Sequence, residues 1–190
     1  MRSNMTDKHL REKKLSSQKV FSGFLLNIYS DEVLLPDGTT GTREYALHPG
    51  AVTIIPFLKN GNVIIERQFR YPVGEVVLEL PAGKIDAGEE PLASGKRELH
   101  EETGYISEKW TEITSFHPVS GYSNEVMHVF LAEDVTYKGG HGEEGEFVEV
   151  IDMPLEKAID LIKCGEINDA KTLIGLFWAE KVRSGEWNRS

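Results

Sequence analysis

Three glutamates within five positions, Glu98, Glu101 and Glu102, constrain this chain more than any other feature. Spacings of three and four residues place side chains on one face of a helix, where like charges oppose helix formation by about 0.2–0.5 kcal/mol per pair. A hard divalent cation that takes carboxylate oxygens turns this repulsion into attraction. The pattern therefore predicts a helix that holds Mg²⁺ or a similar ion. The alternative is a solvated acidic helix face.

Residues that begin and end helices flank the three glutamates. Pro91 suits the first turn of a helix and Gly104 suits its C-terminal stop, which predicts a helix at about 91–103. Glu89 precedes Arg97 with seven residues between them. An ion pair between these two side chains would fasten the preceding loop to the helix.

A glycine-rich loop at 82–88 follows a predicted strand and precedes the helix. Glycine at position 83 allows the backbone to turn sharply and leaves carbonyl oxygens available. The carbonyl of Ala82 is therefore a candidate metal ligand beside Glu98 and Glu102.

The spacing of these residues resembles the signature of the Nudix hydrolases. That signature is Gly, five residues, Glu, seven residues, Arg-Glu-aliphatic, one residue, Glu-Glu, one residue, Gly and a bulky apolar residue, matched here from Gly83 to Tyr105. The resemblance implies an α/β/α sandwich and hydrolysis of a nucleoside diphosphate linked to another moiety. It also implies that Glu98 and Glu102 bind Mg²⁺ or Mn²⁺, that Glu101 often joins them, and that Ala82 lends its carbonyl.

Further segments resemble the ADP-ribose pyrophosphatase branch of that family. They are Arg43-Glu44, His48 to Ala51, Gln68 to Arg70, Glu79 to Gly83, Gly121 to Glu125 and Asp169 to Thr172. By this resemblance Arg43 and Arg70 contact substrate phosphates or ribose, and Glu125 contacts the distal sugar. A surface ion pair or a charge at a strand edge is the alternative for either arginine.

One segment departs from the branch. Ser-Pro-Gly is usual before the aromatic residue, whereas this chain has Val119-Ser120-Gly121. A nucleoside diphosphate sugar remains the expected substrate, but the departure keeps GDP-mannose and ADP-glucose open beside ADP-ribose. A nucleotide-sensing module that has lost turnover is the third hypothesis.

The loop at 138–146 is rich in glycine and in acidic residues. A hydrolase needs a general base to orient the attacking water, and glycines allow such a loop to close. The resemblance implies that the base is a glutamate of this loop. Alignment on the strand that follows favours Glu144, with Glu146 next, and an acidic turn without a role is the alternative.

The remaining pattern mixes strands with a few helices, which indicates an α+β fold or an α/β/α sandwich. Asn60-Gly61 is a strong hairpin signal between two of the strands. Strands are expected at 18–30, 31–35, 42–48, 51–59, 63–70, 75–80, 109–117, 125–134 and 147–152, and further helices at 154–163 and 169–183. We expect residues 1–48 to form an arm and strands that dimerise, and residues 49–190 to form the hydrolase domain.

The resemblance also implies that the N-terminal region crosses to a second subunit. We therefore expect a two-fold homodimer with an active site shared between chains. Burial of the strand at 20–29 inside its own subunit is the alternative. Phe21 is expected in the core rather than as a platform for the nucleobase.

Composition excludes several classes of function. The 190 residues carry a net charge of −10, which repels long nucleic acids unless a local basic patch intervenes. No apolar run approaches about 18 residues, so no membrane span is expected. The polar N-terminus lacks the apolar core of a signal peptide. Cys164 stands alone, which excludes an internal disulfide and suits the reducing cytoplasm.

Overall fold

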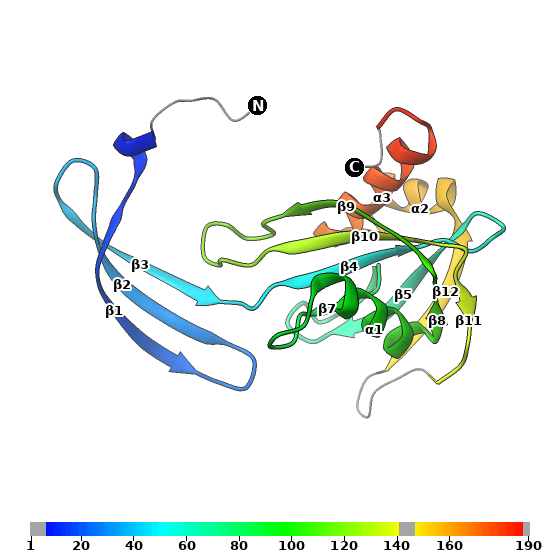
Figure 1. The fold of residues 1–190 in the computed structure, drawn as a ribbon, viewed down its shortest axis with the longest axis horizontal. Coiled ribbons are helices and arrows are strands. Elements are labelled where there is room, and N and C mark those ends of the chain that lie inside the picture. Colours follow the sequence, from blue (N-terminus) through cyan, green and yellow to red (C-terminus); the bar gives the residue numbers. More distant parts are fainter. Residues whose placement is uncertain (1–6, 141–146, 188–190) are drawn as a thin grey trace. The chain divides into compact units, whose positions relative to one another are not determined.

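The computed structural model describes residues 7–140 and 147–187. The chain forms two compact units. One comprises Met1–His48 with Val119–Glu125, and the other comprises Pro49–Pro118 with Val126–Ser190. Each unit has its own sheet structure (Figure 1). None of the helices in the described part of the chain is both long enough and apolar enough to cross a membrane.

The first unit is built on a three-stranded antiparallel sheet with the order β1-β2-β3. A short 3₁₀-helix, η1, precedes it. The elements are η1 (Asp7–Leu10), β1 (Lys13–Ser22), β2 (Asn27–Leu34) and β3 (Thr40–Leu47). The segment Val119–Glu125 joins this unit through the amide of Ala46, which donates to the carbonyl of Tyr122 at 2.9 Å.

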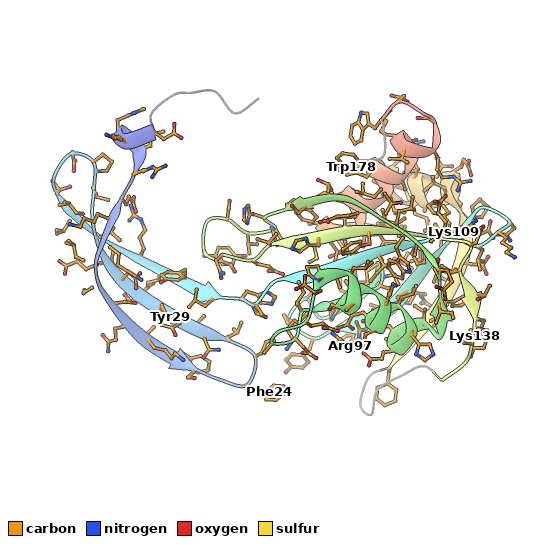
Figure 2. The ribbon with its side chains drawn as sticks, viewed as in Figure 1. Phe24, Tyr29, Arg97, Lys109, Lys138 and Trp178 are labelled. Atoms are coloured by element: carbon orange, nitrogen blue, oxygen red, sulfur yellow. The ribbon has the colours of Figure 1, made fainter. Side chains whose placement is uncertain are left out.

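The single strand expected at 18–30 is wrong, because the chain reverses between Ser22 and Asn27. The amide of Gly23 donates to the carbonyl of Leu26 at 2.8 Å and closes this turn. Glycine suits the position because a Cβ there would lie 2.7 Å from the Phe21 ring. The apolar run that suggested a continuous strand is therefore an exposed turn, with Phe24 at its tip (Figure 2).

The second unit contains two larger sheets and three helices among its described residues. The sheet orders are β7-β4-β10-β9 and β12-β5-β6, and β11 pairs with β8. The elements are β4 (Ala51–Pro56), β5 (Asn62–Arg70), β6 (Glu75–Glu79), β7 (Ala82–Lys84), α1 (Pro91–Thr103), β8 (Tyr105–Ile106), β9 (Lys109–Phe116), β10 (Met127–Glu133), β11 (Thr136–Tyr137), β12 (Val148–Pro154), α2 (Leu155–Lys163) and α3 (Ala170–Arg183).

The hairpin predicted at Asn60-Gly61 forms only as a turn. Gly61 has a φ of +89° and its amide donates to the carbonyl of Leu58. However, β4 and β5 lie in different sheets, and an isolated bridge joins Phe57, just after β4, to Val63. The physical reason is that both edges of each strand are taken. β4 lies between β7 and β10, and β5 lies between β12 and β6. The turn residues determine where the chain reverses, whereas burial of the strands in the sheets determines which strands pair.

Helices cover both faces of the sheets in this unit, with α1 on one face and α2 and α3 on the other (Figure 1). Alternate side chains of one strand enter different cores, as the period of two requires. Ile54 of β4 packs in the cluster with Leu99 of α1, whereas its neighbour Ile55 packs in the cluster with Leu176 of α3. The α+β fold with an α/β/α sandwich is thereby confirmed.

Candidate active site

Helix α1 begins and ends at the residues predicted from sequence. Pro91 is its first residue, and Gly104 follows its last with a φ of +74° and an amide that donates to the carbonyl of His100 at 2.8 Å. Leu99 is completely buried and fixes which face of the helix meets the core. Glu98 and Glu101 therefore lie on the side of α1 that remains partly open to solvent.

Arg97 is the cation that contacts three acidic residues of the motif, Glu89, Glu98 and Glu101. Its Nη1 donates to Glu98 at 2.7 Å and to Glu101 at 2.9 Å. Its Nε and Nη2 donate to the carboxylate of Glu89 at 3.1 and 2.9 Å. The ion pair predicted between Glu89 and Arg97 is therefore present, and Nη2 also reaches the carbonyl of Lys84 at 3.2 Å. One guanidinium fastens the loop to the helix and relieves the repulsion among the carboxylates.

This arrangement changes the proton affinity of the groups involved. Hydrogen bonds from Arg97 hold the pKa of Glu89 below its usual value, although desolvation acts in the opposite direction. Hydrogen bonds to Glu89, Glu101 and Glu98 raise the pKa of Arg97, against the effect of burial. The carboxylate of Glu89 and the guanidinium of Arg97 therefore both stay ionised near neutral pH.

Gly83 serves a different purpose from the sharp turn that we expected. It lies in β7, where it pairs with Val52, and its φ is not positive. A Cβ at this position would lie 1.9 Å from Cδ of Glu98 and within 2.3 Å of both carboxylate oxygens. Glycine is needed here because the carboxylate of Glu98 lies directly against the backbone.

Ala82 contacts the motif through its amide. Its N–H donates to Oε2 of Glu102 at 2.9 Å, and Glu102 is 7% exposed. Ala82 is the first residue of β7, which pairs with the interior strand β4. The position of Glu102 is therefore fixed by a rigid element, which is how a precise binding group is usually held.

The chemistry of these side chains fits a hard divalent cation. Glu98, Glu101, Glu102 and the Ala82 carbonyl offer only oxygen donors, which suit Mg²⁺ and Mn²⁺. Within residues 7–140 and 147–187, no three Asp, Glu, His or Cys side chains form a group that could hold a metal ion as they stand. Nη1 of Arg97 instead donates to both Glu98 and Glu101.

Arg70 of β5 is held by a carboxylate to which the sequence analysis gave no role. Its Nε and Nη2 donate to the two oxygens of Glu79 at 2.7 and 2.9 Å. Burial alone would lower the pKa of Arg70, but the hydrogen bonds and charge of Glu79, with the charge of Glu102, raise it. The sequence feature that could have pointed to Glu79 is its place directly after the apolar run Val76 to Leu78, where a charged residue interrupts the apolar sequence.

Arg43 and Glu125 both lie in the first unit. Arg43 forms an ion pair with Glu12, and its Nε donates to Glu12 at 3.0 Å. Oε1 of Glu125 lies 3.7 Å from Nδ1 of His48. The neighbouring Asn124 accepts the amide of His48 at 2.8 Å. Each proposed contact residue of this unit is thus paired within it.

Glu144 and Glu146, the candidates for the general base, lie outside the described residues. The chain that leads toward them is anchored to the end of α1. The amide of Lys138 donates to the carbonyl of Gly104 at 2.8 Å, and Nε2 of His100 lies 3.0 Å from the carbonyl of Gly139. The start of the loop is therefore tied to the helix that carries the acidic motif.

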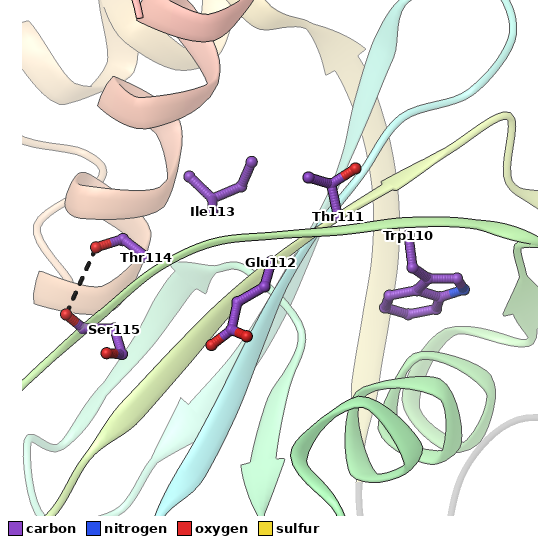
Figure 3. A pocket seen from close by; sticks show the side chains of 6 residues that line it. All are labelled: Trp110, Thr111, Glu112, Ile113, Thr114 and Ser115. Carbon is purple, nitrogen blue, oxygen red and sulfur yellow. Dashed lines mark hydrogen bonds between the residues drawn. The ribbon is translucent and has the colours of Figure 1, made fainter. Parts of the chain in front are cut away.

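A hollow of about 670 Å³ follows β9 and is separate from the acidic motif (Figure 3). Residues Trp110 to Ser115 line it. Ile113 packs into the core with Leu131, and Trp110 packs edge-on against Phe130 at 6.3 Å between ring centres. None of these lining residues belongs to the motif from Gly83 to Tyr105, so this hollow is not part of the candidate active site.

Known proteins resemble this chain over most of its length. An ADP-ribose pyrophosphatase of Bacillus subtilis (strain 168) is 42% identical over 167 residues, which cover 87% of this chain and 90% of the relative. A methanol dehydrogenase activator of Bacillus methanolicus is 36% identical over 171 residues, covering 89% and 92%. A GDP-mannose pyrophosphatase of Yersinia enterocolitica is 31% identical over 169 residues, covering 83% and 88%.

The fold and the family model agree with these relatives. A crystal structure of an ADP compounds hydrolase superposes with a TM-score of 0.83 at 24% identity, covering 93% of this chain and 97% of that one, which shows the shared fold. The NUDIX domain model matches residues 47–174. With the complete acidic motif on α1 and this match, the chain belongs to the NUDIX family.

Proposed function

We propose that this chain is a metal-dependent pyrophosphohydrolase that cleaves the diphosphate of ADP-ribose or a related nucleoside diphosphate sugar. The products would be a nucleoside monophosphate and a sugar phosphate. The observation that carries the proposal is the acidic motif organised around Arg97 on α1. The 42% identity to an ADP-ribose pyrophosphatase supports the substrate class.

Glu98 and Glu102, with Glu101 and the Ala82 carbonyl, are the residues that would hold Mg²⁺ or Mn²⁺. Such an ion neutralises phosphate oxygens and lowers the pKa of a bound water. The chain itself supplies order at this place. Arg97 aligns Glu98 and Glu101, and the Ala82 amide fixes Glu102. Hydrogen bonds from the chain itself thus restrain all three carboxylates.

Arg70 is the substrate-binding residue that the second unit offers. Its side chain is 40% exposed although Glu79 anchors it. A planar guanidinium pairs with two phosphate oxygens at once, which suits a diphosphate. For Arg43 we propose a phosphate or ribose contact, and for Glu125 a contact to the distal sugar. Either contact would compete with the present partners, Glu12 and His48.

Glu144 is the residue we propose as the general base, with Glu146 as the next candidate. A base in this role orients the attacking water and takes its proton. The anchoring of Lys138 and Gly139 to α1 supports a loop that works beside the acidic motif.

Residues 1–48 form, in our proposal, a dimerisation region of a homodimer with a shared active site, and residues 49–190 form the hydrolase domain. All ten residues of β1 are exposed in the isolated chain. Exposed apolar side chains on this unit include Leu15, Val20, Phe21, Phe24, Leu25 and Leu26. Phe21, which we expected in the core, is 55% exposed. A second subunit would cover this apolar surface.

Two further properties of the chain bear on its proposed compartment and substrate. Cys164 is exposed and is the single cysteine, which fits a reducing cytoplasm. The net charge of −10 disfavours a long nucleic acid as a substrate.

A preference for another nucleotide sugar is the second candidate. The Val119-Ser120-Gly121 segment and the relative named GDP-mannose pyrophosphatase favour this possibility. The deciding experiment measures kcat/KM for ADP-ribose, GDP-mannose and ADP-glucose with Mg²⁺ or Mn²⁺, with EDTA as control. We expect metal-dependent release of a phosphomonoester and the highest value for ADP-ribose. Binding of nucleotide sugars without turnover would instead indicate a sensing module.

A further inference from the structure

Arg70 is the first of four side chains of alternating charge that contact one another in a row. We call it the Arg70 ladder, and its members are Arg70, Glu79, Lys171 and Asp169. Glu79 accepts both hydrogen bonds from Arg70, at 2.7 and 2.9 Å, and also forms an ion pair with Nζ of Lys171. The same Nζ donates to Asp169 at 3.0 Å. The ladder joins β5, β6 and the start of α3.

The two side chains of the first ion pair, Arg70 and Glu79, differ greatly in solvent exposure. The side chain of Glu79 is 1% exposed, whereas that of Arg70 is 40% exposed. A carboxylate this deep must be paired, because an isolated buried charge is very costly. Lys171, whose side chain is 13% exposed, supplies the second cation. Glu79 is therefore a fixed anchor, and Arg70 is the member of the ladder that reaches the solvent.

The anchor also fixes which part of Arg70 can meet a ligand. Glu79 takes the edge of the guanidinium formed by Nε and Nη2. The side of Nη1, which Glu79 does not occupy, is then the part that could meet a ligand. A long arginine side chain without such an anchor would sample many rotamers, and ordering them on binding would weaken affinity.

The segment that contains Glu79 connects the ladder to the acidic motif. The amide of Leu80 donates to Oγ1 of Thr172 at 2.9 Å, and that hydroxyl donates to Asp169 at 2.7 Å. Two residues later, the amide of Ala82 donates to Glu102 at 2.9 Å. Residues 79–82 are thus held at three points, so Arg70 and Glu102 are attached to one rigid stretch of backbone.

We propose that Glu79 is a positioning residue for the hydrolysis, held in place by Lys171, and that it acts by fixing the guanidinium of Arg70 toward the diphosphate of the substrate. The inference rests on the proposed function, because it assigns Arg70 to substrate phosphates. It adds a buried ion pair and a lysine of α3 to the groups that decide substrate affinity. Preorganisation of this kind lowers the ordering cost of binding.

The test is a double-mutant cycle of Arg70→Ala and Glu79→Gln, read as kcat/KM for ADP-ribose. We expect Arg70→Ala to lower kcat/KM about 100-fold and Glu79→Gln about 10- to 50-fold, mainly through KM. If Glu79 acts through Arg70, the double variant should equal Arg70→Ala alone. Losses that multiply in the double variant would show that Glu79 acts independently of Arg70 and would overturn the proposal.

Arg67→Gln is the matched control. Arg67 lies on the same strand, with its side chain on the opposite face of β5 from that of Arg70, and pairs with the exposed Glu149. We expect kcat/KM within about twofold of the wild type. An effect as large as that of Glu79→Gln would show that any lost arginine or ion pair on β5 disturbs the enzyme, which contradicts a specific role for the ladder.

Lys171→Met and Lys171→Arg keep the proposal testable if Glu79→Gln fails to fold. We expect Lys171→Met to raise KM about 10-fold and Lys171→Arg to restore most of the loss, because arginine retains the charge beside Glu79. An equal loss in both, or none in either, would overturn the role of Lys171. The thermal midpoint of each variant separates these effects from unfolding.

The wild-type enzyme separates failure of this inference from failure of the proposed function. If it hydrolyses no nucleotide sugar, the Kd of ADP-ribose in EDTA replaces kcat/KM in the same cycle. A wild type that neither cleaves nor binds ADP-ribose would overturn both proposals. An active wild type with an unaffected Arg70→Ala variant would remove Arg70, and therefore the ladder, from substrate binding while leaving the hydrolase proposal intact.

Discussion

The carboxylate of Glu98 lies where residue 83 would carry a side chain. An ideal Cβ on Gly83 would stand 1.9 Å from Cδ of Glu98, far inside van der Waals contact. Gly83 belongs to β7 and Glu98 belongs to α1, so the glycine sets how closely the helix carboxylate approaches the strand. The glycine of the motif is thereby explained by space rather than by backbone conformation.

Gly83→Ala should therefore damage activity more than stability. The new methyl group would displace the flexible end of Glu98, which can move at small cost, so we expect unfolding free energy within about 1 kcal/mol of the wild type. Displacing the carboxylate that we propose as a metal ligand should lower kcat/KM by about 10²-fold. Metal-dependent turnover and urea unfolding measure the two effects. Normal turnover in this variant contradicts the close approach.

Gly95→Ala is the control on the neighbouring helix. A Cβ at position 95 would meet Phe130 and Trp110 at 3.5 Å, an ordinary contact. Alanine also favours a helix interior over glycine by about 0.5–1 kcal/mol. We expect normal activity and equal or slightly higher stability in urea unfolding.

Glu98→Gln should abolish metal-dependent turnover without unfolding the chain. The amide keeps the shape of the side chain but loses the charge that a divalent cation needs. Removing one carboxylate also relieves repulsion on the helix face, which offsets the weaker bond to Arg97. We expect kcat to fall by at least about 10²-fold with a melting temperature close to that of the wild type. Near-normal activity of the Glu98→Gln variant would contradict the proposed role of Glu98 as a metal ligand.

Arg97→Gln should destabilise the chain. The guanidinium holds Glu89, Glu98 and Glu101, and without it their charges repel one another. A buried hydrogen bond to a charged group contributes about 1.5–3 kcal/mol, but Arg97 is partly exposed and solvent screens its several bonds, so we expect a net loss of about 2 kcal/mol in urea unfolding. Arg67→Gln, which breaks an exposed pair, should cost at most about 1 kcal/mol. Equal losses would contradict the central role of Arg97.

Asp169 should make stability depend on pH in the acid range. Burial raises the pKa of Asp169, but the charge of Lys171 and hydrogen bonds from Thr172 outweigh it, so the folded pKa lies below the ordinary value. A depressed pKa stabilises the fold above the unfolded value of about 3.9 and loses that contribution as pH falls through the folded pKa. The stabilisation is therefore present at neutral pH and disappears in acid.

The Asp169→Asn variant isolates the contribution of the Asp169 charge to stability, because asparagine also caps the N-terminus of a helix well. We expect the wild type to be more stable than the variant near neutral pH, with the difference shrinking below about pH 4. Urea unfolding across this range measures it. A difference that stays constant with pH would show that the Asp169 charge adds no stability.

Glu144→Gln and Glu146→Gln decide which loop glutamate is the general base. Loss of a positioned base costs about 10²–10⁴ in rate. We expect Glu144→Gln to lower kcat by this amount and Glu146→Gln to have the smaller effect. The reverse order would transfer the role to Glu146. Equal, small effects would place the base elsewhere in the chain.

Local signals predicted the parts of the fold that depend on few neighbours. The range 91–103 was predicted for α1 and observed to the residue, because the fixed φ of Pro91 and the left-handed φ of Gly104 act within their own turns. The ion pair of Glu89 with Arg97 followed from spacing alone. The mix of strands and helices predicted the sandwich, in which successive side chains of β4 enter two different cores.

Other features could not be read from local signals. The turn at Asn60-Gly61 was predicted, but the partners of β4 and β5 were decided by which edges the rest of the sheet left open. The run at 18–30 had the composition of one strand and folded as two, because Gly23 makes room for a turn over Phe21. Hydrophobic pattern gives the faces of a strand and does not give its neighbours.

The sequence by itself determined the acidic helix and the family, since the motif from Gly83 to Tyr105 fixes charges within a few helical turns. Only the tertiary structure decided that Glu98 fills the space beside Gly83 and that Lys171 joins Glu79 across 92 positions of chain. Short-range backbone preferences act between neighbours in sequence, whereas contacts of this separation exist only once the sheets and helices have packed.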